Sequence, residues 1–140
     1  MDTNYAARDG RRGPTSDAAS PHGMVRVLQA AFVLALLVQF YALYLYVPGA
    51  PDAVAIPHAD KMVHAVIFAV PAAIGVLARL HPWLVGLVLA VHAPVSEVVQ
   101  HLWIPTRAGD PWDVVADWAG IALGLAVGRL LVMGRSRVRG

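Results

Sequence analysis

Four apolar stretches, each about 20 residues long, are the feature that most limits what this chain can fold into. They run over Val27–Val47, Met62–Leu80, Trp83–Trp103 and Val114–Met133, and short connections join them. A helix needs about 20 mainly apolar residues to cross the ~30 Å hydrocarbon layer of a membrane. The sequence therefore predicts an all-α, polytopic membrane protein with four transmembrane helices.

The composition of the chain also favours a membrane over water. Of its 140 residues, 58% are hydrophobic and 14% are charged, whereas about 25% are charged in an average soluble domain. A soluble bundle of buried helices is the alternative, but too few polar residues remain to cover its surface. The absence of cysteine excludes a disulfide scaffold and a cysteine-based zinc or iron–sulfur site.

The residues outside the apolar stretches divide the chain into three parts. Residues 1–23 are rich in Arg, Asp, Gly and Pro and contain almost nothing to bury, so we expect a disordered tail. Residues 24–133 then form the transmembrane domain, and residues 134–140 form a basic tail. A cleaved signal peptide is a weaker interpretation of the first stretch, which exceeds the usual length of about 7–15 residues.

The distribution of basic residues predicts the orientation of the helices. Four spans place both termini on one side of the membrane, and we expect that side to be the cytoplasm. Lys61 and Arg107 then lie outside, and the other basic residues lie inside, in agreement with the positive-inside rule. These inner residues are Arg8, Arg11, Arg12, Arg26, Arg79, Arg129, Arg135, Arg137 and Arg139.

The same distribution explains why the chain is basic. The net charge of +2 reflects topology and contact with anionic lipid head groups, so we expect membrane lipids and no nucleic acid as partners. The sequence therefore predicts a multi-pass protein of the cell membrane.

Polar residues gather at the predicted outer ends of the helices. They comprise Asp60, Lys61 and His64 at the start of the second stretch, Glu97, Gln100 and His101 near the end of the third, and Arg107, Asp110, Asp113 and Asp117 around the start of the fourth. Ionisable groups within a span are costly and usually mark function. We expect an extracytoplasmic polar pocket, the alternative being ion pairs that only close this end of the bundle.

Spacing along the helices predicts specific contacts. Asp60 and His64 are four residues apart, which allows the carboxylate to orient or charge the imidazole. Gly120, Gly124 and Gly128 form a stripe that lets another backbone approach closely. This stripe indicates helix packing and could also serve a homo-oligomer.

Two prolines interrupt the apolar stretches. Pro71 and Pro94 lie inside the second and third stretches, where we expect them to bend the helices. Each should also free a backbone carbonyl that then needs another partner.

An ordered series of motifs resembles the VanZ-like family of small bacterial membrane proteins. It covers about residues 60–128 and reads Asp60-Lys61-x-x-His64, Ser96-Glu97-x-x-Gln100, Pro105-x-Arg107 and Asp110-x-x-Asp113-x-x-x-Asp117-x-x-Gly120-x-x-x-Gly124. Two positions depart from the family pattern: Asp117 stands where Asn is usual, and His101 stands where an apolar residue is common. The family is named for a protein associated with teicoplanin resistance, so the resemblance implies a role in the cell envelope.

The favoured hypothesis is a binding protein for a cell-wall precursor, a lipid head group or a glycopeptide antibiotic. Lys61 and Arg107 would contact phosphate or carboxylate groups, with arginine able to bind in a bidentate manner. Glu97, Asp113 and Asp117 would position these cations or accept ligand amines. The expected ligand-binding residues are Asp60, Lys61, His64, Glu97, Gln100, Arg107, Asp110, Asp113 and Asp117.

Two other functions remain open. A hydrolase or transferase acting on a lipid-linked substrate would use Asp60 and His64 as an acid–base pair, Glu97 as a second acid or base, and Arg107 as an oxyanion stabiliser. A proton-coupled carrier would use His92, near the middle of the third stretch, as a relay toward Glu97. His92 on its own is more typical of a neutral, hydrogen-bonded core histidine.

The sequence predicts no cofactor. A divalent metal ion held by His64, Glu97, His101 and Asp113 is the weakest alternative, because nitrogen and oxygen ligands suit such an ion. No H-E-x-x-H or H-x-x-E-H motif supports it.

Overall fold

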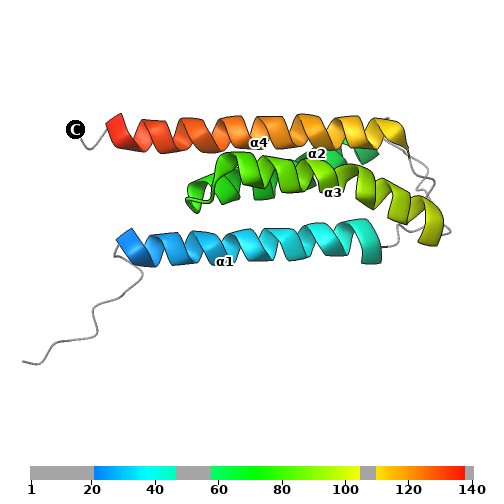
Figure 1. The fold of residues 1–140 in the computed structure, drawn as a ribbon, viewed down its shortest axis with the longest axis horizontal. Helices are drawn as coiled ribbons and strands as arrows, with labels where there is room; N and C mark the ends of the chain where they lie inside the picture. Colours follow the sequence, from blue (N-terminus) through cyan, green and yellow to red (C-terminus); the bar gives the residue numbers. More distant parts are fainter. Residues whose placement is uncertain (1–20, 47–57, 105–109, 138–140) are drawn as a thin grey trace, which may run out of the picture.

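The computed structural model describes residues 21–46, 58–104 and 110–137; most of these residues are helical, and there is no strand among them. The chain forms α1 (Pro21–Phe40), a π-helical turn η2 (Tyr41–Leu45), α2 (Ala59–Leu77), α3 (Pro82–Trp103) and α4 (Pro111–Arg137). Figure 1 shows the four α-helices running roughly side by side. The predicted all-α class and its four long helices are confirmed.

The helix boundaries differ by a few residues from the predicted apolar stretches; α2, for example, spans Ala59–Leu77 instead of Met62–Leu80. The helical region also exceeds the predicted domain of residues 24–133, because α1 begins at Pro21 and α4 continues beyond Met133 to Arg137. Proline is favoured in the first turn of a helix, where its missing N–H has no intrahelical role. Arginines in the last turn of α4 interact favourably with the negative end of the helix dipole. The rest of the two expected tails, residues 1–20 and 138–140, lies outside the described residues.

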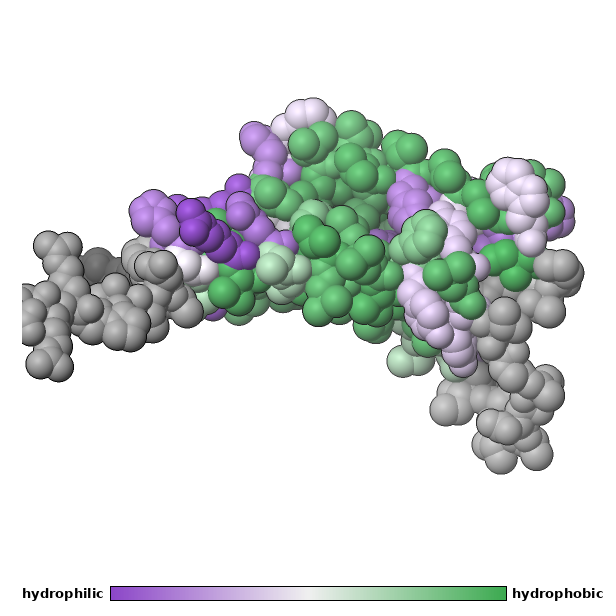
Figure 2. Space-filling view, turned by 90° about the horizontal axis from the view of Figure 1, so that it is seen from below, coloured by the Kyte–Doolittle hydropathy of each residue, from purple (hydrophilic) through white to green (hydrophobic). Residues whose placement is uncertain are grey.

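The four helices are long and apolar enough to cross a membrane. Their most apolar segments reach a mean hydropathy of 1.9 in the α1–η2 span and 1.6 in each of the others. Large apolar side chains such as Leu34, Leu123 and Leu130 are more than 60% exposed. Figure 2 shows a broad hydrophobic belt on the face of the molecule that it displays. Contact of such a belt with water is unfavourable, whereas contact with the acyl chains of lipid is not. The chain thus has the architecture of a multi-pass membrane protein.

Helices α2 and α4 form the most extensive contact of the bundle. A Cβ atom added to Gly120 would meet the carbonyl oxygen of Ala65, and one added to Gly124 would meet that of Ala69. A Cβ on Gly128 would lie 2.8 Å from Val76 Cβ. The glycine stripe therefore packs on α2 within one chain, and the predicted helix-packing role is confirmed.

Proline 94 has the predicted effect on the backbone of α3. Because proline lacks an N–H, the carbonyl of Ala90, four residues earlier, has no helical donor. The indole Nε1 of Trp118 on α4 donates to this carbonyl over 3.0 Å. Figure 1 shows α3 changing direction in its second half.

The two ends of the bundle carry opposite charges. The start of α1, the turn between α2 and α3, and the end of α4 lie at one end (Figure 1). We call this the arginine end, because it carries Arg26, Arg79, Arg129, Arg135 and Arg137. Every acidic residue in the described part of the chain lies toward the other end, which brings η2, the start of α2, the end of α3 and the start of α4 together.

Candidate functional site

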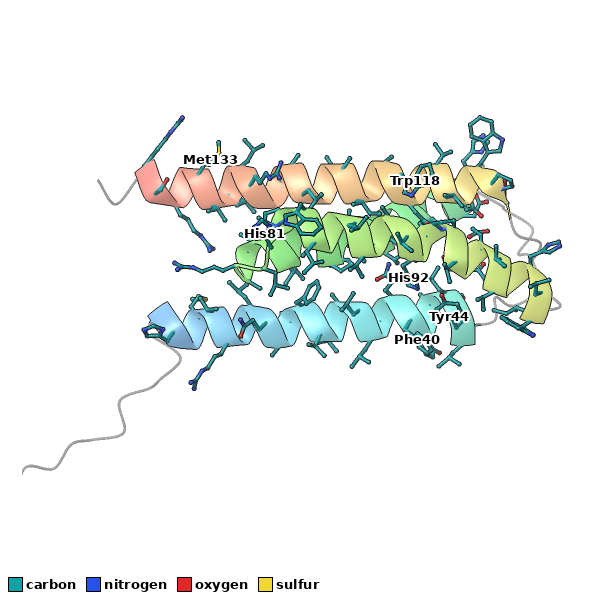
Figure 3. All side chains as sticks on the ribbon, viewed as in Figure 1. Phe40, Tyr44, His81, His92, Trp118 and Met133 are labelled. Atoms are coloured by element: carbon teal, nitrogen blue, oxygen red, sulfur yellow. The ribbon has the colours of Figure 1, made fainter. Side chains whose placement is uncertain are left out.

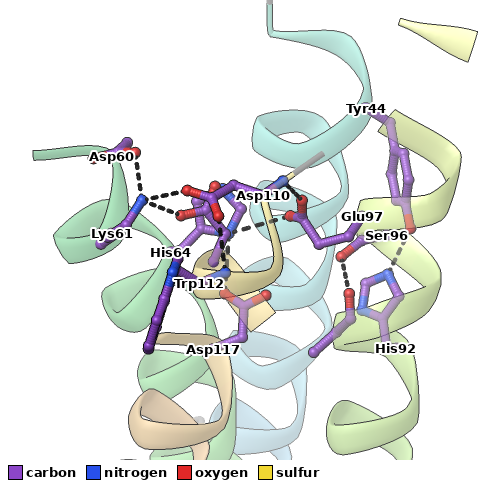
Figure 4. A network of polar contacts seen from close by, with 12 residues as sticks. Tyr44, Asp60, Lys61, His64, His92, Ser96, Glu97, Asp110, Trp112 and Asp117 are labelled. Carbon is purple, nitrogen blue, oxygen red and sulfur yellow. Dashed lines mark hydrogen bonds and ion pairs between the residues drawn. The ribbon is translucent and has the colours of Figure 1, made fainter. Parts of the chain in front are cut away.

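Three helices contribute ionisable side chains to one compact group. Asp60, Lys61 and His64 come from the first turns of α2, Glu97 from the second half of α3, and Asp110, Asp113 and Asp117 from the residue before α4 and its first turns. We call these seven residues the acidic cluster (Figure 4). The convergence of polar residues predicted at this end is therefore present for all seven.

Lys61 is the cationic centre at the more exposed side of the acidic cluster. Its Nζ lies 2.8 Å from Asp110 Oδ2 and 3.1 Å from both Asp60 Oδ2 and Asp113 Oδ1. An ammonium group has three N–H donors, so these three carboxylates satisfy it fully. In this geometry Lys61 is committed to neighbouring side chains and has no donor left for a phosphate.

His64 occupies the buried side of the cluster and pairs with Asp117. Its Nδ1 lies 3.1 Å from Asp117 Oδ1, and its two nitrogens lie 3.9 Å from Glu97 Oε1 and Asp113 Oδ2. The expected pair of Asp60 with His64 is wrong, because Asp60 turns to Lys61 while His64 faces α3 and α4. The four-residue spacing allowed that pair, but α4 supplies a closer and more buried carboxylate.

Asp110 links the cluster to the start of α4. Its Oδ1 accepts from the Trp112 N–H over 2.9 Å, as a helix-capping carboxylate does, and its own N–H donates to Glu97 Oε2 over 3.0 Å. The Lys61 ammonium, together with the Trp112 N–H, holds the pKa of Asp110 below its ordinary value of 3.8. Asp110 is therefore a structural carboxylate that joins α2, α3 and α4.

The deeper carboxylates are almost completely shielded from solvent. Glu97 is 7% exposed, Asp113 8% and Asp117 0%. Within the described residues, Glu97 Oε1 and Asp117 Oδ2 have no hydrogen-bond partner. Buried carboxylate oxygens are costly to leave unpaired, so these two atoms mark the place where a proton, a cation or a ligand donor would be stabilised.

The structure places the remaining predicted site residues differently. Gln100 lies on α3 three residues after Glu97, and its side chain is buried. His101, the next residue, is exposed. Arg107 and Pro105 lie outside the described residues, so the predicted role of Arg107 stays a prediction.

Three side chains of the cluster could hold a metal ion. His64, Glu97 and Asp113 each offer one ligand atom, and these atoms lie within 4.8 Å of one another. His101 is not part of this group, so the predicted four-ligand set is wrong in that residue. Asp60, Asp110 and Asp113 form a second such group, but its carboxylates already bind the Lys61 ammonium.

A second polar contact lies next to the cluster and was not predicted. The Tyr44 hydroxyl lies 2.9 Å from His92 Nε2, which joins η2 to α3, and Figure 3 shows the two residues on facing helices. The Phe68 ring lies 5.7 Å from the His92 ring between centroids. In the sequence, nothing sets Tyr44 apart from the neighbouring Tyr41 and Tyr46 of the first apolar stretch.

Gln39 is the other polar residue that the sequence reasoning passed over. It is 1% exposed, and among the described residues neither its amide nitrogen nor its oxygen has a hydrogen-bond partner. Its signal in the sequence is that Gln39 interrupts a long apolar stretch, four residues before Leu43.

Comparisons of the chain with protein-family models, with curated proteins and with solved structures found no match.

Proposed function

We propose that this chain is a multi-pass protein of the bacterial cell membrane that binds a positively charged group of a cell-envelope ligand through its acidic cluster. The bias of arginine toward one end supports an orientation with both termini in the cytoplasm and the cluster on the extracytoplasmic side. The motifs shared with the VanZ-like family support a role in the envelope.

The excess of carboxylates is the observation that carries this proposal. Five carboxylates share one ammonium and one imidazole. Even with His64 protonated, the ionised cluster has a formal charge of −3. A charge of this size in a partly dry site favours a cationic guest.

The pairing of Lys61 with three carboxylates favours a cationic ligand over an anionic one. Because its three donors bind carboxylates, Lys61 has no donor left for an anionic group, and an amine is the better match to Glu97, Asp113 and Asp117. Protonated amines occur in cell-wall peptides, in ethanolamine lipids and in glycopeptide antibiotics. These molecules form the ligand class that we propose.

Binding of teicoplanin to the purified protein in lipid nanodiscs tests the proposal. We expect Glu97→Gln and Asp113→Asn each to weaken binding about tenfold, because each removes a charge that contacts the guest. His101→Gln is the matched control, since it changes an exposed polar residue at the same end of the bundle. A cell-wall peptide with its amine free or acetylated provides the second probe. Equal binding of both peptide forms and of all variants would contradict the proposal.

A membrane-embedded hydrolase or transferase is the second candidate, and the contact between His64 and Asp117 favours it. A carboxylate bound to Nδ1 fixes the imidazole tautomer and leaves Nε2 to accept a proton from an attacking hydroxyl or water. Incubation with a lipid-linked cell-wall precursor, followed by mass spectrometry, would detect cleavage or transfer. Product that forms with the native chain and disappears with His64→Gln would favour catalysis over binding.

A further inference from the structure

A groove of about 640 Å³ opens at the arginine end, opposite the acidic cluster. The first turns of α1, the end of α2, the start of α3 and the last turns of α4 line it. Its volume lies in the range of about 300–1,000 Å³ that is usual for small-molecule sites. The groove shares no residue with the acidic cluster, so a ligand here would be independent of the proposed function.

The lining of the groove is amphipathic. Leu28, Val76 and Val132 represent its apolar walls, and Arg79, Arg129 and Arg135 bring three guanidinium groups to it. Figure 2 shows strongly hydrophilic residues at this end, directly beside the hydrophobic belt. An occupant must therefore combine an anionic head with an apolar body.

The three arginines have no acidic partners in the described part of the chain. None of the ion pairs between described residues includes Arg79, Arg129 or Arg135, and the described carboxylates all lie toward the other end. Arginine binds phosphate oxygens in a bidentate manner. The positive charge at this groove is thus available to an external anion.

The position of Arg79 directs its charge to this end of the bundle. It lies in the turn that joins α2 to α3, just after the end of α2, and has a left-handed backbone conformation with a φ of 62°. Such a turn sits at a helix end, which in a transmembrane helix is the level of the lipid head groups. Arg129 and Arg135 belong to α4, so the arginines of the groove come from two separate segments of the chain.

We propose that this groove is a binding site for one anionic phospholipid. The arginines hold the phosphate, and an acyl chain lies against the walls that Leu28, Val76 and Val132 provide. A free phosphate or a nucleotide would leave these walls uncovered, whereas a neutral lipid would leave the three guanidinium groups without an anion. The occupant therefore comes from the leaflet on the arginine side.

Native mass spectrometry of the full chain, released from nanodiscs containing equal amounts of phosphatidylglycerol and phosphatidylcholine, tests the site. We expect one retained phosphatidylglycerol per chain. Arg129→Gln should lower its retention about fivefold, the effect of one basic residue near an anionic lipid surface. Arg137→Gln is the matched control, because Arg137 belongs to the same helix and the same end but does not line the groove. Retention of phosphatidylglycerol by Arg137→Gln should stay within twofold of the value for the native chain.

Leu28→Trp tests the contribution of the apolar walls of the groove separately from that of the arginines. This variant keeps every arginine but fills part of the apolar wall, so it should also displace the lipid. Inorganic phosphate in millimolar excess should not release the lipid, which distinguishes a lipid site from a simple phosphate site. Equal losses for Arg129→Gln and Arg137→Gln, or unchanged retention in Leu28→Trp, would overturn the proposal in favour of a general surface-charge effect.

Discussion

His64 Nδ1 lies 3.1 Å from Asp117 Oδ1, and this buried contact is continuous with the glycine stripe that packs α4 on α2. Gly120, one turn after Asp117, faces the carbonyl of Ala65, the residue that follows His64. The two backbones can approach closely only because glycine has no side chain there. The same approach brings a short aspartate on α4 within reach of the imidazole on α2, so the packing of the helices and the geometry of the acidic cluster depend on each other.

The first prediction concerns the oxygen that Asp117 offers to His64. Asp117→Asn keeps an oxygen that can accept from Nδ1–H and removes one charge from a crowded group, so we expect the free energy of unfolding to change by less than about 1 kcal/mol. Asp117→Ala leaves the buried imidazole nitrogen unpaired and should cost roughly 1–3 kcal/mol. Unfolding in detergent measures both. Asp60→Ala, which removes an exposed partner of Lys61, is the control and should cost under about 1 kcal/mol. A loss in Asp117→Asn as large as in Asp117→Ala would show that the charge, not the acceptor, matters.

The second prediction concerns the glycine stripe. Gly120→Ala and Gly124→Ala each place a methyl group against a backbone carbonyl of α2, so we expect each to destabilise the fold by about 1–3 kcal/mol. Gly134→Ala is the matched control on the same helix, because a Cβ there meets no atom within 4 Å. It should be neutral or stabilising by up to about 1 kcal/mol, since alanine favours helix. If all three variants had the same thermal stability, the close packing of α4 on α2 would be refuted.

The third prediction concerns pH and follows from Asp110. Its pKa is held below 3.8 in the folded chain, so its stabilising contribution is present above the unfolded pKa and is lost as pH falls through the folded pKa. Lys61→Gln removes the main cause of the depression, and the pKa of Asp110 should rise. We therefore expect a smaller acid-induced loss of stability in this variant, because the folded and unfolded pKa values of Asp110 then lie closer together. Carboxyl NMR of Asp110 measures the shift directly. Arg79→Gln, which removes a cation at the opposite end, should leave the titration unchanged.

The sequence predicts the helices well because their main determinant is local. The length of each apolar stretch and the prolines at 71 and 94 can be counted in one dimension, and the stripe Gly120–Gly124–Gly128 is a local pattern on one helix. Helix ends are less predictable, since Pro21 and Arg137 stabilise terminal turns without adding apolar residues. The composition of the acidic cluster is likewise visible, because charged residues in an apolar sequence stand out.

The pairing within the cluster could not be predicted in the same way. Whether His64 contacts Asp60 or Asp117 depends on the axial position of α4 relative to α2. The close contact of Gly120 with Ala65 fixes this position. The partner of His92 depends on η2, where Tyr46 N–H donates to the Tyr41 carbonyl over 2.8 Å in a five-residue turn. A π-helical turn rotates the residues around it relative to an α-helix. Long-range register and local irregularity therefore decide the partners.

The fourth prediction concerns the contact between Tyr44 and His92. Tyr44→Phe keeps the ring but removes the hydroxyl that lies 2.9 Å from Nε2, so we expect a loss of about 1–2 kcal/mol in unfolding free energy. Tyr41→Phe, at an exposed tyrosine of the same π-helical turn, should change the free energy of unfolding by less than about 0.5 kcal/mol.

The hypothesis of a proton-coupled carrier makes a separate prediction for His92. Proton-coupled flux into vesicles should disappear with His92→Ala, and flux that persists would exclude a relay through His92.

The last prediction concerns Trp118 and the carbonyl that Pro94 frees. Trp118→Phe removes the donor to Ala90 O and should cost about 1–2 kcal/mol, because the carbonyl then has no partner in an apolar setting. Pro94→Ala restores the N–H that an uninterrupted helix would donate to Ala90 O, so Trp118→Phe should cost less in that background. The difference between the two costs, about 1 kcal/mol, is the coupling energy of a double-mutant cycle. Trp112→Phe is the control, since this exposed indole lies at the start of the same helix, and its effect should be the same with and without Pro94. Strictly additive effects of Trp118→Phe and Pro94→Ala would mean that the indole does not replace the missing backbone donor.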